Sequence, residues 1–162
     1  MGGAAGQKNV ETFERFCNRP QALGRHADVR YVRGIVLEDR LDPILIWRFR
    51  GTPADGDFDA FYAAHERMLA AGAPFLTILD ATAASLPTPA QMRRQAEWVA
   101  AHAEALRAQS LGVALVLPSQ PLRRALLCMT AWRCVPGPHV LCPHMAAAMM
   151  WAEARLLIRS AA

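Results

Sequence analysis

The stretch that decides the fold runs from Ile44 to Ala83. It begins with the apolar run ILIWRFRG (44–51), continues through DFDAFYAAHERMLAAG (57–72) and ends with PFLTILDATA (74–83). In the middle segment, apolar residues recur at i, i+3, i+4 and i+7, which predicts a helix with one buried face. The flanking runs are short and apolar, which predicts two buried strands. A strand, a helix and a strand in this order indicate a parallel βαβ unit.

The rest of the chain repeats this alternation of short apolar strands and amphipathic helices. The order predicts one α/β domain over residues 29–160, with a single mixed, mostly parallel sheet of about five strands and about four helices. Residues 1–28 lack a clean periodicity, so we expect an N-terminal extension that is partly flexible or a short helix. The elements expected in chain order are strands over 31–37 and 44–49 joined by a polar turn at 38–40, a helix that Asp57 opens, a strand over 75–79, a helix over 88–109, a strand over 113–117, a helix from about 119, a strand over 139–142 and a helix over 145–157.

Composition limits the class of protein. The chain has 162 residues, of which 53% are apolar and 20% charged, which excludes a disordered protein and suits a single domain. The net charge is +4, and Lys8 is the single lysine beside 17 arginines. No apolar run of the chain reaches the ~20 residues that a membrane span needs. With no apolar leader at its start, the protein is expected to be soluble and cytoplasmic.

Two further segments complete a resemblance to a known family. They are LGVALVLPS (111–119) and HVLCPHMAAAMMWAEARL (139–156), where a short strand runs into a helix that carries a Trp. With the opening hairpin and the βαβ unit, they resemble the STAS superfamily (the sulfate-transporter and anti-sigma-factor-antagonist domain) in its SpoIIAA-like branch. The resemblance covers residues 31–157. It implies a SpoIIAA-like fold and a non-enzymatic, cytosolic regulatory module that binds a protein partner.

The start of the helix at 88 departs from that family. Anti-sigma-factor antagonists carry an Asp-Ser-Ser/Thr-Gly phosphorylation motif there, whereas this chain reads Pro87-Thr88-Pro89-Ala90. Thr88 is the single hydroxyl near the phosphoacceptor position and has no acidic or glycine neighbour, which argues against a kinase-switched antagonist. A hydroxyl followed by proline is typical of a helix N-cap, so we interpret Thr88 as a cap.

Two arginine pairs lie near helix starts, where the helix dipole disfavours cations. Arg93 and Arg94 occupy the second turn after Thr88, and Arg123 and Arg124 the first turn after Ser119. Because both helices follow parallel strands, their starts are expected at one edge of the sheet. Residues that break a local rule often serve function, so this edge is a candidate site for an anion or an acidic partner protein. The alternative is that these arginines are solvated along the helix surfaces.

A second candidate group follows the third strand, in a loop expected over 81–87. Asp80, Thr82 and Ser85 lie where ligands of open α/β sheets collect, and Asp80 matches an Asp that the resembled family often carries there. The alternative is that Asp80 and Thr82 hydrogen-bond the loop backbone. No histidine or second carboxylate can be assigned beside Asp80, so we predict no catalytic residue and no enzyme.

The histidines and cysteines also have structural interpretations. His65 lies on the apolar face of the first helix, where we expect a backbone carbonyl to satisfy it. Zinc-type ligands cluster near the C-terminus, but their spacing fits none of the usual short ligand pairs, so neither a metal nor a cofactor is predicted. The cysteines are expected to be free thiols. The clustered residues are Cys128, Cys134, His139, Cys142 and His144.

The leading prediction is therefore a protein-binding module whose docking surface is the edge with the two arginine pairs. The alternative is a small-molecule or lipid-like ligand binder, because the SpoIIAA-like branch is similar in fold to Sec14-type lipid-transfer domains. That function would need a deep apolar cavity. Nucleic-acid binding is not expected, since the charge is modest and no recognised motif is present.

Overall fold

A computed structural model describes residues 34–127 and 135–160, and their strands form one sheet in the order β1-β2-β3-β4-β5. β1 runs antiparallel to β2, and the remaining neighbours are parallel. The predicted mixed, mostly parallel sheet of five strands is confirmed. The strands are β1 (Ile35–Leu41), β2 (Ile44–Gly51), β3 (Phe75–Ala84), β4 (Ser110–Val116) and β5 (His139–Cys142).

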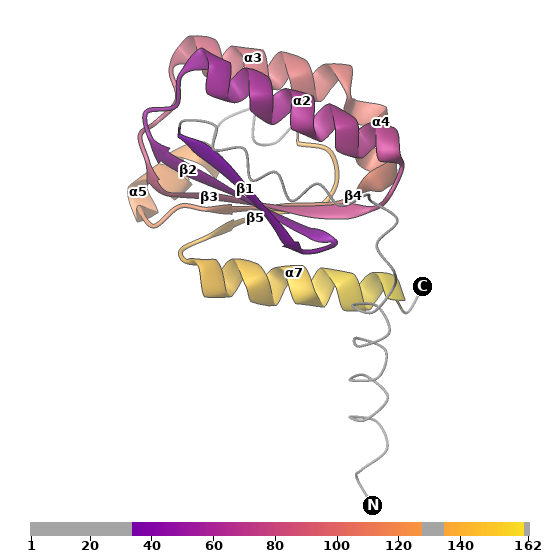
Figure 1. Cartoon of the computed structure of the whole chain (residues 1–162). Coiled ribbons are helices and arrows are strands. Elements are labelled where there is room, and N and C mark those ends of the chain that lie inside the picture. Colours follow the sequence, from indigo (N-terminus) through magenta and orange to yellow (C-terminus); the bar gives the residue numbers. More distant parts are fainter. Residues whose placement is uncertain (1–33, 128–134, 161–162) are drawn as a thin grey trace, which may run out of the picture.

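Helices cover both faces of the sheet. Figure 1 shows α2, α3 and α4 together above the sheet and α7 alone below it, with α5 at the edge where β3 and β4 end. None of the helices in the described ranges is long and apolar enough to cross a membrane. The helices are α2 (Asp55–Ala71), α3 (Pro89–Ala101), α4 (Ala103–Gln109), α5 (Gln120–Leu127) and α7 (Met145–Ser160).

Two helix predictions need correction. The helix expected over 88–109 is divided at His102, whose backbone (φ −108°, ψ 14°) ends α3 and precedes α4. Asp57 does not open α2, because the helix begins two residues earlier with Ala54 at the N-cap. The Asp57 carboxylate nevertheless accepts the Ala54 N–H at 2.8 Å, so it still satisfies a free donor at the helix start.

The opening hairpin is also shifted along the sequence. Glu38 pairs with Ile46 and Leu41 with Ile44, so the expected turn at 38–40 lies inside β1. The chain reverses instead at 42–43, where proline interrupts the apolar pattern. Residues 31–33 of the predicted first strand and the predicted extension over 1–28 lie outside the described residues.

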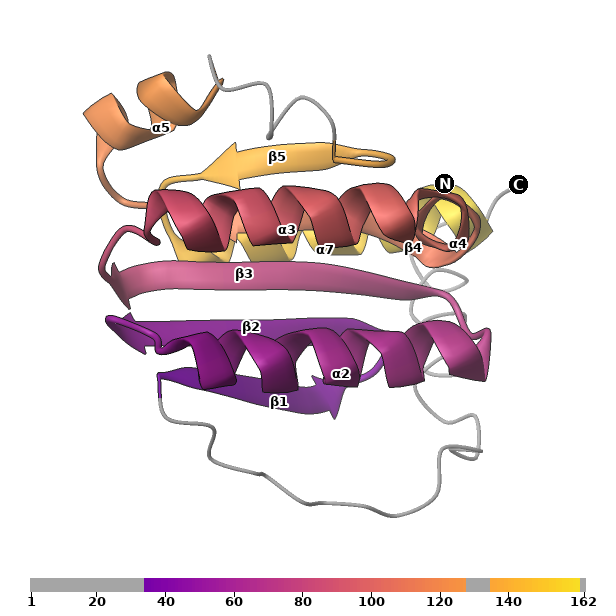
Figure 2. The same cartoon turned by 90° about the horizontal axis from the view of Figure 1, so that it is seen from above.

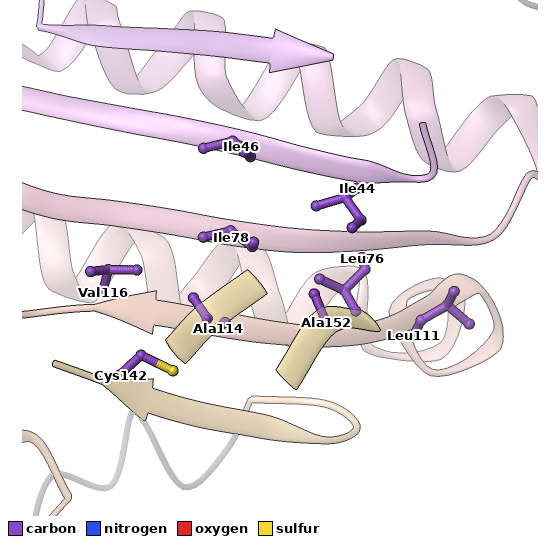
Figure 3. Close-up of a cluster of buried hydrophobic side chains, with 10 residues drawn as sticks. Ile44, Ile46, Leu76, Ile78, Leu111, Ala114, Val116, Cys142 and Ala152 are labelled. Atoms are coloured by element: carbon purple, nitrogen blue, oxygen red, sulfur yellow. The ribbon is translucent and has the colours of Figure 1, made fainter. Parts of the chain in front are cut away.

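The two faces of the sheet bury different side chains, because alternate residues of a strand point to opposite sides. Toward α7, β2 and β3 present aliphatic residues such as Ile46 and Ile78, which Figure 3 shows gathered in one layer with Ala152 of α7. Toward α2 and α3, Trp47 of β2 packs in an aromatic cluster with Phe61. The aromatic layer fixes the position of the helices that carry the candidate site.

Candidate functional site

The starts of four helices lie at one edge of the sheet. β2, β3, β4 and β5 are parallel, and each leads into a helix at its carboxyl end, so α2, α3, α5 and α7 all begin there. Figure 2 shows the starts of α2, α3 and α5 at the same side of the sheet. In open parallel sheets this edge is where ligands bind. We refer to it as the helix-start edge.

Thr88 caps α3, as its sequence context indicates. Its hydroxyl accepts the Gln91 N–H at 3.2 Å, and the Gln91 side chain accepts the Thr88 N–H at 3.0 Å, which forms a capping box. The Gln91 amide also donates to the Pro53 carbonyl at 3.2 Å and to Asp55 at 2.9 Å. This buried glutamine therefore joins the start of α3 to the start of α2.

Arg93 and Arg94 have different surroundings although they are adjacent in sequence. Arg94 forms an ion pair with Asp59 of α2, and its guanidinium carbon lies 5.3 Å from the centroid of the Tyr62 ring. The hydrogen bond to Asp59 raises the pKa of the Arg94 guanidinium. Arg93 is exposed, and within the described ranges its side chain has no ion pair or hydrogen bond.

The same division occurs at α5. Arg123 donates to the carbonyls of Leu117 and Pro118 at 2.5 and 2.6 Å, so it satisfies the end of β4. The Ser119 hydroxyl accepts the Leu122 N–H at 3.4 Å. Arg124 is exposed and, among the described residues, has no side-chain partner. One arginine of each pair thus serves an internal contact and the other faces solvent.

The placement of Asp80 and Thr82 in a loop is wrong. β3 continues to Ala84, because Ala83 and Ala84 pair with Arg50 and Gly51 after a register shift. Asp80 and Thr82 therefore belong to a strand. Ser85 does follow the strand, and its N–H donates to the Gly51 carbonyl at 2.7 Å.

Asp80 belongs to a row of charges that crosses three strands. Arg48 of β2 is its register partner and donates to it at 2.7 Å, while the same guanidinium donates to Glu38 of β1 at 2.7 Å. The Asp80 carboxylate also accepts the Thr82 N–H at 3.1 Å. The hydrogen bond to Glu38, followed by the charges of both carboxylates, raises the pKa of Arg48. Asp80 is thus paired with a cation.

His65 has the backbone carbonyl partner that we expected, and its side chain is buried. Its Nδ1 lies 3.0 Å from the Phe61 carbonyl, so the Nδ1–H donates to that oxygen. The residue is 5% exposed, and its ring is stacked on Trp47 at a centroid distance of 5.0 Å. Burial lowers the pKa of His65 to about 4, which keeps the imidazole neutral at physiological pH.

The described members of the cysteine–histidine cluster do not form a metal site. Cys142 is a buried free thiol whose pKa is raised by burial, and it packs in the aliphatic layer. His139 contacts the Gly137 carbonyl, and His144 accepts the Ala147 N–H at the start of α7. Residues 34–127 and 135–160 contain no group of three potential metal ligands. Cys128 and Cys134 lie outside the described residues.

A groove that the sequence did not indicate lies between α2 and α3. It has a volume of about 390 Å³, and we call it the α2–α3 groove. Its side chains come from two helices, and residues that face each other, such as Glu66 and Trp98, are 32 positions apart in the sequence. No local motif therefore links them. Trp98 donates its indole N–H to Glu66 at 3.0 Å across the groove. The groove is lined by Asp59, Tyr62, Glu66, Arg94, Glu97 and Trp98, with Ala63 and Ala101 beside them.

Comparison with known proteins supports the fold. No protein-family model matches the sequence, and no curated protein matches it. Among solved structures, the chain is similar to an uncharacterized protein of the DUF3478 family with a SpoIIAA-like fold, from Shewanella loihica PV-4. The TM-score is 0.56 at 18% sequence identity, over 72% of this chain and 90% of the other. The chain therefore has the SpoIIAA-like fold that its element order predicted.

Proposed function

We propose that this protein is a non-enzymatic regulatory module that binds an acidic partner protein at the helix-start edge. The observation that carries the proposal is the exposed surface at the start of α3. Leu86, in the loop before α3, has 65% of its surface exposed. The guanidinium of Arg93, which has no partner in the described part of the chain, follows in the second turn of the helix. Exposed apolar side chains and arginines are both common in protein interfaces.

The second arginine pair extends this surface. β3 and β4 are neighbours, so α3 and α5 begin at adjacent positions along the same edge. Arg124 adds a second guanidinium that is free among the described residues, and Leu127 on the same helix is 55% exposed. The positive charge complements an acidic partner, and electrostatic complementarity favours rapid association.

The packing under α2 and α3 favours this function over binding of a lipid-like ligand. A lipid-like ligand needs a deep apolar cavity. In the described structure, the space between these helices and the sheet is filled by rings. The centroids of Trp47 and Phe61 are 4.8 Å apart, and those of Phe61 and His65 are 4.3 Å apart. Each of these three residues is at most 5% exposed.

The surroundings of Asp80 and His65 fit a non-enzymatic module. Asp80 is neutralised by Arg48, and His65 is enclosed by aromatic rings and held by a backbone carbonyl. A general acid or base must reach a substrate proton. Neither side chain has such access in the described structure.

Affinity capture with matched arginine variants tests the proposal. Wild-type protein, Arg93→Ala/Arg124→Ala and the control Arg107→Ala, which alters an exposed arginine of α4, would each be used to capture partners from the native cell. The retained partner would then be purified and its affinity measured. We expect binding about tenfold weaker for the double variant, because two charge contacts are lost, and unchanged for the control.

Salt and the apolar contact provide two further checks. Raising the ionic strength should weaken the wild-type complex more than the double-variant complex, because screening acts on exposed charges. Leu86→Asp should weaken binding of the partner at every salt concentration, because it removes an apolar contact that salt does not screen. Equal capture by wild-type and double-variant protein would refute the proposal.

A further inference from the structure

The α2–α3 groove carries unbalanced negative charge on a chain whose net charge is +4. Asp59, Glu66 and Glu97 bring three carboxylates to it, against the single guanidinium of Arg94. Arg94 pairs with Asp59, and Glu66 accepts a hydrogen bond from Trp98. Glu97 is exposed, and within the described ranges no cation or donor pairs with it. The groove therefore has the charge to accept an added cation.

A buried polar atom in the wall of the groove is an independent sign of a ligand. Tyr62 lines the groove and is only 4% exposed, and its hydroxyl has no hydrogen-bond partner among residues 34–127 and 135–160. Buried tyrosine hydroxyls usually have a partner, since an unpaired one costs free energy. Burial raises the pKa of Tyr62 to about 12, so the hydroxyl keeps its proton at physiological pH. It can both donate a hydrogen bond to a bound group and accept one.

Arg94 shows how a guanidinium fits this groove. Its planar group lies over the Tyr62 ring while it pairs with Asp59. Tyr62 is also stacked with Trp98 at a centroid distance of 5.4 Å, and Trp98 is stacked with His102 at 4.4 Å. An added guanidinium that reaches the Glu97 carboxylate can form a two-point pair with it, which an ammonium group cannot do.

The shape of the groove suits a peptide. It is open to solvent rather than enclosed, and the small side chains of Ala63 and Ala101 lie beside the charged residues. Glu66 and Glu97 come from different helices, so a segment lying between α2 and α3 can meet both. A peptide can place a guanidinium at Glu97, beside the wall that contains Tyr62.

We propose that the α2–α3 groove binds an arginine-containing basic peptide segment of a partner protein. Glu97 pairs with the arginine guanidinium, and the Tyr62 hydroxyl completes its hydrogen bonding with the same segment. This surface is separate from the exposed arginines of the helix-start edge, which attract acidic groups. The protein thus has one surface for each sign of charge.

The test measures binding of a fluorescein-labelled Gly-Arg-Gly-Arg-Gly peptide to the full-length protein by anisotropy. We expect saturable binding that weakens as salt is added. Glu97→Gln removes the unpaired carboxylate without breaking an internal contact, and it should weaken binding roughly fivefold, as expected for one partly exposed ion pair. Tyr62→Phe keeps the stacked ring, and it should weaken binding roughly threefold through loss of one hydrogen bond.

Controls separate this site from other surfaces. Glu153→Gln alters an exposed carboxylate of α7, on the opposite side of the sheet, and should bind the peptide like wild type. Arg93→Ala/Arg124→Ala should also bind it like wild type, so failure here and failure of the helix-start edge are distinguishable. Two competitors, L-argininamide and Gly-Lys-Gly-Lys-Gly, should each bind more weakly than the arginine peptide.

Several results would overturn the proposal. They are no saturable binding at millimolar peptide, equal affinity of wild type and Glu97→Gln, or equal affinity for the lysine peptide. Binding of L-argininamide as tight as that of the peptide would also overturn it, because the groove would then be a site for a small cation.

Discussion

The two faces of the sheet differ in what their side chains leave unsatisfied. Toward α7, the layer holds aliphatic residues and small alanines, including Ala148 and Ala152, both fully buried. Toward α2 and α3, the layer holds aromatic rings. Two of its buried polar atoms, Trp47 Nε1 and the Tyr62 hydroxyl, have no hydrogen-bond partner within the described structure. The α7 face is therefore held together by the close packing of apolar side chains. The aromatic face retains polar groups that a ligand could satisfy, and it borders the α2–α3 groove.

The largest effect is expected at the closest packing on the α7 face. At Gly112 (φ +151°), an added Cβ would lie 2.5 Å from Trp151 Cη2 and 2.9 Å from the Pro138 carbonyl oxygen. Gly112→Ala should lower the free energy of unfolding by about 4 kcal/mol, because backbone strain adds to overpacking. Urea unfolding measures this loss.

Gly137→Ala is the matched control for Gly112→Ala. Gly137 also has a positive φ (+82°), but its nearest atom to an added Cβ, the Ser110 carbonyl oxygen, is 3.9 Å away. This variant should lower the free energy of unfolding by only about 1 kcal/mol, because it adds backbone strain without overpacking. Equal losses for the two variants would show that α7 can move away from the sheet, and the distinction between the faces would then fail.

The next effect concerns the aromatic face and depends on pH. The pKa of His65 is about 4 in the folded protein and 6.5 in an ordinary setting. Above pH 6.5 the imidazole is neutral in both states, so it has no effect. Between pH 6.5 and pH 4 only the unfolded chain takes up the proton, and the folded state should lose about 3 kcal/mol of stability from this group.

His65→Phe isolates this titration from that of the carboxylates. Unfolding curves of the two proteins at pH 7, 5.5 and 4 give the difference in free energy of unfolding. This difference should shift in favour of the variant as the pH falls, and it should be constant above pH 7. Parallel pH profiles would show that solvent or another proton acceptor reaches His65, and the aromatic layer would then be less closed than it is here.

A smaller effect is expected at the polar end of the α7 face. Arg48→Met leaves the Asp80 carboxylate, whose side chain is 7% exposed, with the Thr82 N–H as its remaining described partner. The free energy of unfolding of this variant should fall by about 2 kcal/mol, the usual cost of an unpaired buried group. Glu38→Gln alters the exposed carboxylate of the same row and should lose under about 1 kcal/mol in urea unfolding. Equal losses would contradict the importance of burial at Asp80.

The sequence predicted the elements better than the contacts between them. Apolar periodicity was sufficient for the βαβ unit and for β5, whose bounds agree with the predicted 139–142. The partner of Asp80 depends on the parallel register with Arg48, 32 residues away, which no local pattern encodes. Without that register, a strand residue looked like a loop residue.

The arginine pairs show the same limit on a helix. Adjacent helical residues point about 100° apart, so two neighbours seldom face the same surroundings. Arg94 forms an ion pair with Asp59 of α2, whereas Arg93 is exposed. The prediction gave both arginines of a pair the same role, whereas one forms an internal contact and the other is exposed. The α2–α3 groove escaped prediction for a related reason, because its walls come from two helices whose alignment depends on the sheet.

An effect smaller than that of Arg48→Met is expected at the α3 cap, where the sequence was sufficient. Thr88→Ala removes the acceptor of the Gln91 N–H and should lower the free energy of unfolding by about 1 kcal/mol. Thr88→Ser keeps the hydroxyl and should lie within a few tenths of a kcal/mol of wild type. Hydrogen exchange should quicken in the first turn of α3 and stay unchanged in α7, because the sheet separates the two helices. Faster exchange in α7 as well would mean that the two faces open together, and the aromatic face could not then respond to a ligand on its own.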